Sequence, residues 1–254
     1  MNARGNGLAW RVERALSKAW PPLESALCGG WLLGFSHGVS RRANSANPTR
    51  PDMRDIEAGI AACAALYRAR RMPVLFRIPS IIEPGAERRL DQLGYRAEGE
   101  SLTLYADLVE AEAAPDPDVA LAPRPTAEWL AAMAAMQSHG AEARTAYRRI
   151  VASVAAPAAF ASLRCDGEWA ALAYGAISDG LLCLQSAIVD VRYRGRGHAR
   201  RMLGALVAWG AGAGAQGVCL QVDASNAPAH RLYGRLGLAR TLYRYHYRPA
   251  PPEE

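Results

Sequence analysis

The chain has 254 residues, of which 50% are hydrophobic and 21% are charged, and its formal net charge is +6. This length fits one large or two small domains, and the composition is typical of a globular protein with an ample core. No apolar run approaches the roughly 20 residues of a membrane-spanning helix, which excludes a helical membrane protein. Residues 1–10 lack the apolar stretch of a secretory signal, so we expect a cytoplasmic protein.

Nearly all the positive charge is arginine, because Lys18 is the only lysine. Arginine suits phosphate and carboxylate partners, which fits a polyphosphate cofactor. Basic residues do not interleave with aromatic ones as in nucleic-acid modules, so we do not expect a nucleic-acid partner. The cysteines are odd in number and none forms a Cys-x-x-Cys pair, so we expect reduced, buried thiols and no metal site. They are Cys28, Cys63, Cys165, Cys183 and Cys219.

Residues 111–125 contain four prolines and few large apolar side chains, which predicts a linker. The linker divides the chain into a domain over residues 1–110 and a domain over residues 126–254. Apolar periodicity and turn residues predict the elements of the first domain. In chain order they are a helix (8–19), a strand (30–39), a polar loop (41–48), a helix (55–69), a strand (73–78), a helix (87–93) and a strand (96–108).

The second domain begins with two predicted helices, and three strands follow that form an antiparallel meander. Asp166-Gly167 and Asp179-Gly180 separate these strands, and Asp-Gly is a strong hairpin signal because both turn positions favour positive φ. Gly237 ends the last predicted helix. The elements are helices 126–138 and 142–154, strands 159–165, 169–177 and 181–191, helix 198–211, strand 217–222, helix 227–236 and strand 238–247.

Two stretches of the chain share a pattern, one beginning at Phe76 and one at Leu220. Each contains a strand, a turn, a helix with an Arg-Leu pair, a Leu-Gly end, an arginine and a final strand. This self-similarity predicts a duplicated fold.

A glycine-rich loop between a strand and a helix carries the strongest signal for function. The first N–H groups of a helix are unpaired, and the helix dipole favours an anion there. Glycines let the backbone close on a pyrophosphate, and neighbouring arginines add charge-assisted hydrogen bonds. The loop consists of Arg194, Gly195, Arg196, Gly197, His198 and Ala199.

A second motif follows this loop and is formed by Asn226, Ala229, Tyr233 and the end Leu236-Gly237-Leu238. With these two motifs, the chain resembles the GNAT superfamily of N-acetyltransferases. The resemblance implies an α/β (α+β) fold, in which helices flank a mixed, mostly antiparallel sheet, here duplicated in tandem. It also implies that acetyl-CoA is the co-substrate and that it binds where strands 181–191 and 217–222 splay apart.

The resemblance also assigns roles to individual residues. Backbone groups near Ile188 and Val189 would hold the pantetheine arm, and the amides of residues 194–199 would hold the pyrophosphate. Asn226 would contact the cofactor near its acyl end, and Tyr233 would protonate the departing thiolate. An oxyanion donor is also needed, and the Val189 N–H is a candidate. Asn226 also suits a helix N-cap, and Tyr233 also suits helix packing.

The sequence leaves the general base open. His139 and Glu142 lie near the expected acceptor entrance, whereas Glu168 at a hairpin turn is expected to be exposed. His198 and His230 lie within the cofactor motifs and are expected to face phosphate or solvent. His246 lies on the last strand, where alternation places three tyrosines on one face, and packing is favoured there over an acceptor role. These tyrosines are Tyr243, Tyr245 and Tyr247.

The first domain lacks both motifs, so we expect that it does not bind acetyl-CoA. One alternative is a structural role, in which it takes the place of a second subunit. The other makes its polar loop part of the acceptor pocket through Arg41, Arg42, Asn44 and Asn47.

The expected acceptor is a primary amine of a small molecule or a protein N-terminus, and the basic charge favours an acidic one. A monomer or homodimer without membrane contact is expected. The alternative function is a non-catalytic acyl-CoA-binding or regulatory module.

Overall fold

The computed structural model describes residues 3–37, 40–109, 111 and 113–252. It contains one mixed sheet of 11 strands in the order β1-β2-β3-β4-β11-β5-β10-β9-β8-β7-β6. Most neighbouring strands are antiparallel, and the pairs β3–β4 and β9–β10 are parallel. This confirms the predicted mixed, mostly antiparallel sheet flanked by helices.

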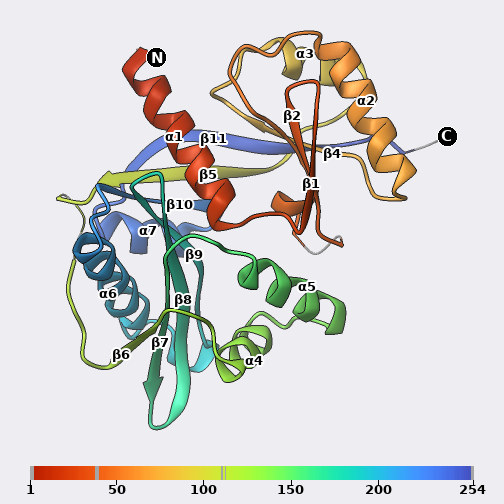
Figure 1. Ribbon diagram of the computed structural model, residues 1–254. Helices are drawn as coiled ribbons and strands as arrows, with labels where there is room; N and C mark the ends of the chain where they lie inside the picture. Colours follow the sequence, from red (N-terminus) through yellow and green to blue (C-terminus); the bar gives the residue numbers. More distant parts are fainter. Residues whose placement is uncertain (1–2, 38–39, 110, 112, 253–254) are drawn as a thin grey trace.

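Most elements of the N-terminal half occupy the upper right of Figure 1, whereas α1 and β5 extend to the left over the other half. The elements of this half are α1 (Ala3–Ala19), β1 (Glu24–Cys28), β2 (Trp31–Phe35), the 3-10 helix η1 (Arg42–Asn44), β3 (Ala46–Pro48), α2 (Ile56–Ala69), β4 (Leu75–Pro79), α3 (Gly85–Gln92) and β5 (Glu98–Asp107).

Most elements of the C-terminal half occupy the lower part of the same view, whereas β11 crosses to the upper right. The elements of this half are β6 (Val119–Ala122), α4 (Ala127–Met136), α5 (Ala141–Ala152), β7 (Ala158–Cys165), β8 (Glu168–Ser178), β9 (Leu181–Val189), η2 (Val191–Tyr193), α6 (His198–Gly212), β10 (Gly217–Asp223), α7 (Ala227–Arg235) and β11 (Arg240–Pro249).

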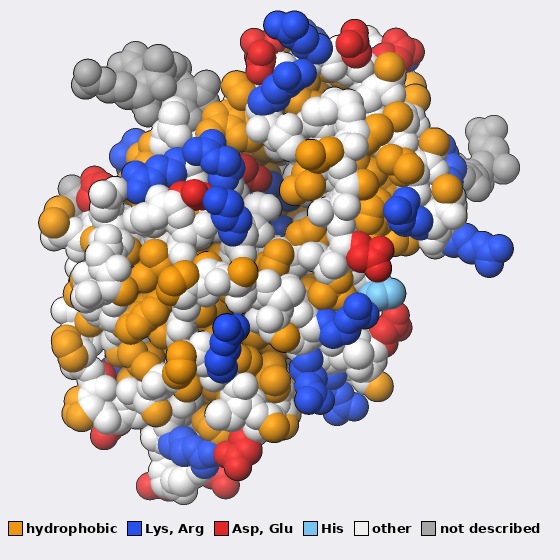
Figure 2. Space-filling view, viewed as in Figure 1, with side chains coloured by type: hydrophobic (Ala, Val, Ile, Leu, Met, Phe, Trp, Pro, Cys, Tyr) orange, Lys and Arg blue, Asp and Glu red, His pale blue; other side chains and the backbone are white. Residues whose placement is uncertain are grey.

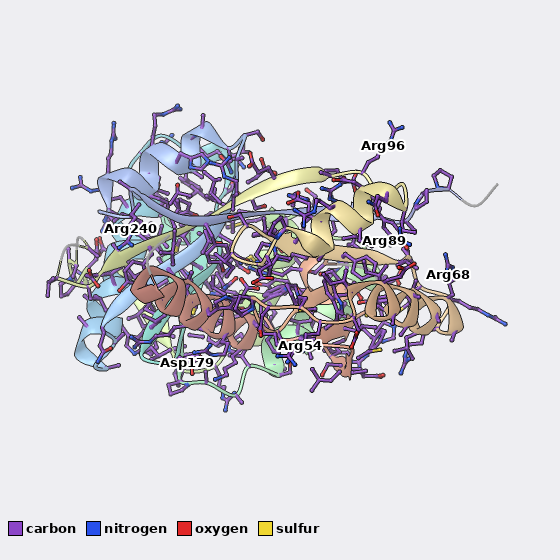
Figure 3. All side chains as sticks on the ribbon, turned by 90° about the horizontal axis from the view of Figure 1, so that it is seen from above. Arg54, Arg68, Arg89, Arg96, Asp179 and Arg240 are labelled. Carbon is purple, nitrogen blue, oxygen red and sulfur yellow. The ribbon has the colours of Figure 1, made fainter. Side chains whose placement is uncertain are left out.

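The two halves repeat one order of elements and exchange their last strands. Three strands, a helix, a parallel strand, a short helix and a long strand occur as β1 to β5 and again as β7 to β11. The last strand of the C-terminal half, β11, pairs with β4, and the last strand of the N-terminal half, β5, pairs with β10. These two long strands also pair with each other and cross the middle of the molecule (Figures 1 and 3). The predicted duplication is therefore confirmed.

The Asp-Gly turns predicted from the sequence form the hairpins of the meander. Asp166 and Gly167 have φ of 52° and 81°, and Asp179 and Gly180 have φ of 50° and 71°. Positive φ at both positions matches the right-handed twist of the flanking strands. At the end of α7, Gly237 adopts a φ of 86° and terminates the helix as predicted.

Three short strands were not predicted. β1 precedes the predicted strand 30–39, of which only β2 forms, and Gly38 and Val39 of that strand lie outside the described residues. β3 lies within the segment predicted as a polar loop and is paired on both sides. β6 lies within the predicted linker and pairs with β7. That segment is also fixed to α6, since Arg201 Nε donates to Asp116 Oδ2 at 2.6 Å. Glu110 and Glu112, at its start, lie outside the described residues.

Helix α1 fixes the N-terminal half to the sheet of the C-terminal half. Arg11 Nε donates to the carbonyl of Asp179 at 2.7 Å, and Lys18 forms an ion pair with its carboxylate at 2.9 Å. Figure 3 labels Asp179 beside this helix. On the buried side of α1, Glu13 pairs with Arg77 of β4. Helix α6 covers the opposite face of the sheet, so the central strands are buried on both sides.

Candidate active site

The parallel strands β9 and β10 separate after three paired positions, and the last pair is Cys183 and Cys219. The two buried Sγ atoms lie 3.6 Å apart. Beyond them, the edges of both strands that face each other have no strand partner. This is the splay predicted from the resemblance.

A bulge changes the direction of the β9 side chains just beyond the splay. Leu172 of β8 pairs with Ile188, but Tyr174 pairs with Gln185, so one extra residue stands on β9. Within this bulge, Ser186 has a φ of 53°. This left-handed backbone conformation is unusual for a residue other than glycine and is typical of strained positions next to functional sites.

The backbone of Val189 faces the open edge of the splay. The amide of Asp190 donates to the carbonyl of Ala170 on β8 at 3.0 Å, and successive strand residues present their backbone groups to opposite edges. The N–H and C=O of Val189 therefore point away from β8. Its carbonyl accepts a hydrogen bond from Arg194 Nε at 3.2 Å.

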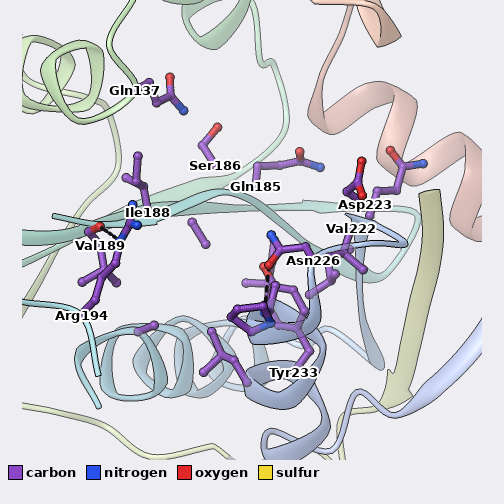
Figure 4. Close-up of a pocket in the computed structure, with 18 of the residues that line it drawn as sticks. Gln137, Gln185, Ser186, Ile188, Val189, Arg194, Val222, Asp223, Asn226 and Tyr233 are labelled. Atoms are coloured by element: carbon purple, nitrogen blue, oxygen red, sulfur yellow. Dashed lines mark hydrogen bonds between the residues drawn. The ribbon is translucent and has the colours of Figure 1, made fainter. Parts of the chain in front are cut away.

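A cleft of about 1120 Å³ passes through the sheet at this splay. Figure 4 shows the side chains of Gln137, Gln185 and Ser186 on one side of β9 and those of Asn226 and Tyr233 on the other. We call these the acceptor side and the cofactor side. The sequence-predicted residues that line the cleft are Ile188, Val189, Arg194, Gly195, Gly197, His198, Ala199, Asn226 and Tyr233.

The glycine loop leaves open space at the start of α6. Gly195 and Gly197 have φ of 76° and 81°, and a Cβ at either position would meet no atom within 4 Å. The unpaired N–H groups of the first turn of α6 lie next to this space, which fits an anion. His198 lies 3.6 Å from Cys165 Sγ through its Nε2. Arg196 is exposed and is not among the residues that line the cleft.

Helix α7 presents the second motif to the cofactor side. Asn226 caps this helix, because its side chain accepts from the amide of Ala229 at 3.1 Å, and it also lines the cleft. Tyr233 lines the cleft from the next turns, and burial raises the pKa of its hydroxyl. The hydroxyl therefore remains protonated at neutral pH and can donate a proton.

Residues from both halves of the chain line the acceptor side. From the N-terminal half come Trp20 and Arg42, whose guanidinium lies 5.3 Å from the centre of the Trp20 ring. From α5 comes Tyr147, whose ring lies 5.5 Å from that of Trp20. His139, between α4 and α5, also lines the cleft, and burial lowers the pKa of its imidazole.

Several buried polar atoms of the cleft have no hydrogen-bond partner within the protein. They are Gln137 Oε1, His139 Nδ1, Gln185 Nε2 and His198 Nδ1. Unsatisfied buried polar groups are uncommon in folded proteins, and their concentration here indicates a site that binds a polar ligand.

The remaining sequence candidates lie elsewhere. Glu142 and Glu168 are exposed and do not line the cleft, and His246 interacts with Glu87 and Arg248. His230 contacts the carbonyl of Asp223 through Nε2 at 3.0 Å.

In the N-terminal loop, only Arg42 of the four candidates lines the cleft. Arg41 pairs with Glu98, and Asn44 holds the loop through Ser36 and Ser40. Asn47 donates to the carbonyl of Ser45 and, through its own Oδ1, accepts from Arg77.

Sequence reasoning missed Trp20, Tyr147, Gln185 and Gln221 as lining residues. Two of these residues could have been noticed in the sequence, because Gln185 and Gln221 are polar side chains within otherwise apolar strands.

The fold and the cleft are those of an N-acetyltransferase of the GNAT superfamily. The chain belongs to the family described as "Probable histone acetyltransferase Rv0428c C-terminal", whose model matches residues 10–248.

Individual relatives agree with this assignment. "Uncharacterized N-acetyltransferase YobR" of Bacillus subtilis is 24% identical over 242 residues, covering 94% of this chain and 97% of that protein. "Probable histone acetyltransferase Rv0428c" of Mycobacterium tuberculosis is 29% identical over 80% of this chain, which spans 62% of the length of that protein. The solved structure of a GCN5-related N-acetyltransferase from Kribbella flavida superposes with a TM-score of 0.70 at 17% identity, covering 98% of this chain and 96% of that one.

Within the described residues, no helix is both long and apolar enough to cross a membrane. In the same part of the chain, no three His, Cys, Asp or Glu side chains gather as metal ligands would.

Proposed function

We propose that this protein transfers an acetyl group from acetyl-CoA to a primary amine by direct attack inside the cleft. The observation that carries the proposal is the passage through the sheet. The glycine loop and Tyr233 lie on one side, and the unpartnered polar atoms of Gln137, His139 and Gln185 lie on the other. A thioester entering from the cofactor side would meet an amine entering from the acceptor side at the splay of β9 and β10.

The residues of the cofactor side fit the parts of acetyl-CoA. Amides at the start of α6, opened by Gly195 and Gly197, bind the pyrophosphate, and Arg194 adds positive charge. The free backbone edge of β9 at Val189 suits the amides of the pantetheine arm. Ile188 adds an apolar side chain, and Asn226 holds the start of α7 beside the acyl end.

In the reaction, the neutral amine forms a bond to the thioester carbon, and the bond from carbon to sulfur breaks. The carbonyl oxygen becomes negative in between, and the N–H of Val189 on the open edge stabilises it. Tyr233 gives its proton to the departing thiolate, since the ordinary pKa of a tyrosine is about 10, near that of a thiol. The proton released by the attacking amine must go to a base on the acceptor side.

His139 is the sequence candidate for this base that lines the cleft. Burial lowers the pKa of its imidazole, which keeps the ring neutral at physiological pH and able to accept a proton. Its Nδ1 is buried without a hydrogen-bond partner within the protein.

The face of the molecule seen in Figure 2 does not favour nucleic acid as the acceptor. On the face seen in Figure 2, Lys and Arg side chains are interspersed with acidic and hydrophobic ones. A nucleic-acid interface would present a continuous basic stripe.

The test is an acetyl-transfer assay that follows release of the CoA thiol with a panel of amines. The panel contains amino acids, polyamines, aminoglycosides, peptides with free N-termini and histone peptides, since the family description names a histone acetyltransferase. Acceptor-dependent release together with an acetylated product of the expected mass supports the proposal. Binding of acetyl-CoA without transfer to any of these amines would favour the non-catalytic acyl-CoA-binding module.

A further inference from the structure

We propose that the acceptor amine also carries a carboxylate, and that Arg42 binds this carboxylate. The inference rests on the proposed function and names the class of acceptor as amino acids. It is carried by the position of one guanidinium from the N-terminal half inside the cleft of the C-terminal half.

Arg42 bridges the two strands that form the splay. Its Nη1 donates to Gln221 Oε1 on β10 at 2.6 Å, and its Nη2 donates to Gln185 Oε1 on β9 at 2.8 Å. Both glutamines lie two residues beyond the last pair, Cys183 and Cys219. The guanidinium therefore stands at the narrow end of the splay, on the acceptor side.

Hydrogen bonds hold the loop that carries Arg42 in place. Asn44 is buried and accepts from the amide of Ser36 at 2.6 Å while donating to the carbonyl of Ser40 at 2.9 Å. Trp20 Nε1 donates to Ser40 Oγ at 3.0 Å, and the Trp20 ring packs against the guanidinium. The position of the charge is thus set before any ligand binds.

Hydrogen-bonding capacity remains at Arg42 after these contacts. A guanidinium has five N–H donors, and the two contacts to neutral amide oxygens use two of them. Among the described residues, no carboxylate forms an ion pair with Arg42, and Gln185 Nε2 beside it is buried without a partner. A planar carboxylate matches both the fork of the guanidinium and this extra donor.

Charge in the cleft favours the same partner. Among the residues that the structure describes, five arginines line the cleft, but only one carboxylate does, that of Asp223. Asp223 Oδ1 already accepts from the amide of Ser225 at 2.8 Å. A purely cationic amine would be repelled by the positive charge of Arg42, and the Trp20 ring that could attract a cation already packs against Arg42. An amino acid brings a compensating negative charge.

The experiment compares the common L-amino acids with their α-carboxamides as acceptors, using wild type, Arg42→Gln and Arg41→Gln. Arg41 is the matched control, because it is the neighbouring arginine, it pairs with Glu98, and it does not line the cleft. In wild type and Arg41→Gln, we expect at least one amino acid to react with a KM roughly 10- to 100-fold below that of its carboxamide. In Arg42→Gln this preference should disappear, with KM for acetyl-CoA unchanged.

The inference would be overturned if wild type had an equal or lower KM for the carboxamides than for the amino acids. It would also be overturned if Arg42→Gln raised KM equally for both forms of the acceptor. If Arg42→Gln does not fold, the wild-type comparison decides alone. Calorimetric titration of wild type with the same pairs in the presence of CoA separates this inference from the proposed function. Selective binding of an amino acid without transfer supports the carboxylate site while the transferase proposal fails. Transfer only to amines without a carboxylate supports the transferase and overturns the site.

Discussion

Gly197 and Gly214 lie at opposite ends of α6 and have the same backbone φ. Each has a φ of 81°, and a Cβ at either position would meet no atom within 4 Å. Gly197 lines the cleft, whereas Gly214 follows the last turn of the helix outside it. The two positions therefore form a matched pair, in which a side chain introduces equal backbone strain but only one of them blocks the cofactor side.

We expect Gly197→Glu to abolish acetyl-CoA binding and Gly214→Glu to preserve it. A side chain at either position costs about 1–2 kcal/mol of strain, since both backbones are left-handed. A ligand present at 100 times its Kd should stabilise wild type by about 2.7 kcal/mol, which a thermal shift assay detects. A shift of equal size in both variants would place the cofactor elsewhere.

Replacement of Tyr233 by Phe should reduce kcat about 100-fold or more, because the thiolate would leave without its proton donor. Binding of acetyl-CoA should remain within a few-fold, since only the hydroxyl is removed. Tyr193→Phe is the control, because Tyr193 also lines the cleft near the glycine loop. Steady-state kinetics and isothermal titration of acetyl-CoA measure both effects. Full activity of Tyr233→Phe would mean that another group, or water, protonates CoA.

The pH dependence of transfer should identify His139. Burial lowers its pKa below the ordinary value of 6.5, so the neutral base is present above that lowered value and is lost as pH falls through it. The profile of kcat/KM should therefore show an acidic limb with an apparent pKa below 6.5. His139→Gln should lose this limb together with most of the rate. Glu142→Gln, at an exposed residue outside the cleft, should keep it. A limb that persists in His139→Gln would assign the base to another group.

Glu13→Gln should destabilise the fold by about 3–5 kcal/mol, because Arg77 would remain buried without a counter-ion. Glu57→Gln is the contrast, since Glu57 pairs with Arg89 but is 73% exposed, and its loss should cost at most about 1 kcal/mol. Urea unfolding at pH 7 measures both.

The same carboxylate should also make stability depend on pH. Burial alone would raise the pKa of Glu13, but Arg77 and the Tyr243 hydroxyl lower it below its ordinary value of 4.5. Its contribution is therefore present above about pH 4.5 and is lost as pH falls through the lowered value. A Glu13→Gln variant as stable as wild type would contradict the assignment of a buried charge pair.

Neither half of the chain should fold alone. A fragment of residues 1–110 lacks β11, which pairs with both β4 and β5, and a fragment of residues 111–254 lacks β5, which pairs with both β10 and β11. Circular dichroism and urea titration should show no cooperative unfolding of either fragment, and co-expression should restore a complex. Cooperative unfolding of one isolated fragment would instead support two independent domains.

Local signals in the sequence were sufficient for much of this fold. Asp166-Gly167 and Asp179-Gly180 predicted two hairpins because the turn conformation depends on those residues themselves. Strands β3 and β6 were missed because they have 3 and 4 residues, and their extended form depends on pairing with distant strands.

The two sides of the cleft differed in the same way. The residues expected on the cofactor side belong to contiguous motifs, so Gly197, Asn226 and Tyr233 could be proposed from the resemblance that these motifs carry. Arg42 and Gln185 are 143 positions apart in the sequence, and only the arrangement of the sheet brings them together. For the acceptor side, the sequence therefore showed only a polar loop of open role. It did not indicate which side chain of this loop lines the cleft.

The exchanged strands β5 and β11 have a consequence for how such a protein can change. In a symmetric homodimer, every substitution occurs twice, once in each copy of the site. Here one polypeptide carries both halves, so each half can accumulate different substitutions while the shared strands keep them together. Loss of the glycine loop in one half then leaves the other half intact, and the freed loop can supply Arg42 to its neighbour. Fusion into one chain thus allows one half to keep the glycine loop while the other half supplies Arg42, which two identical subunits cannot do.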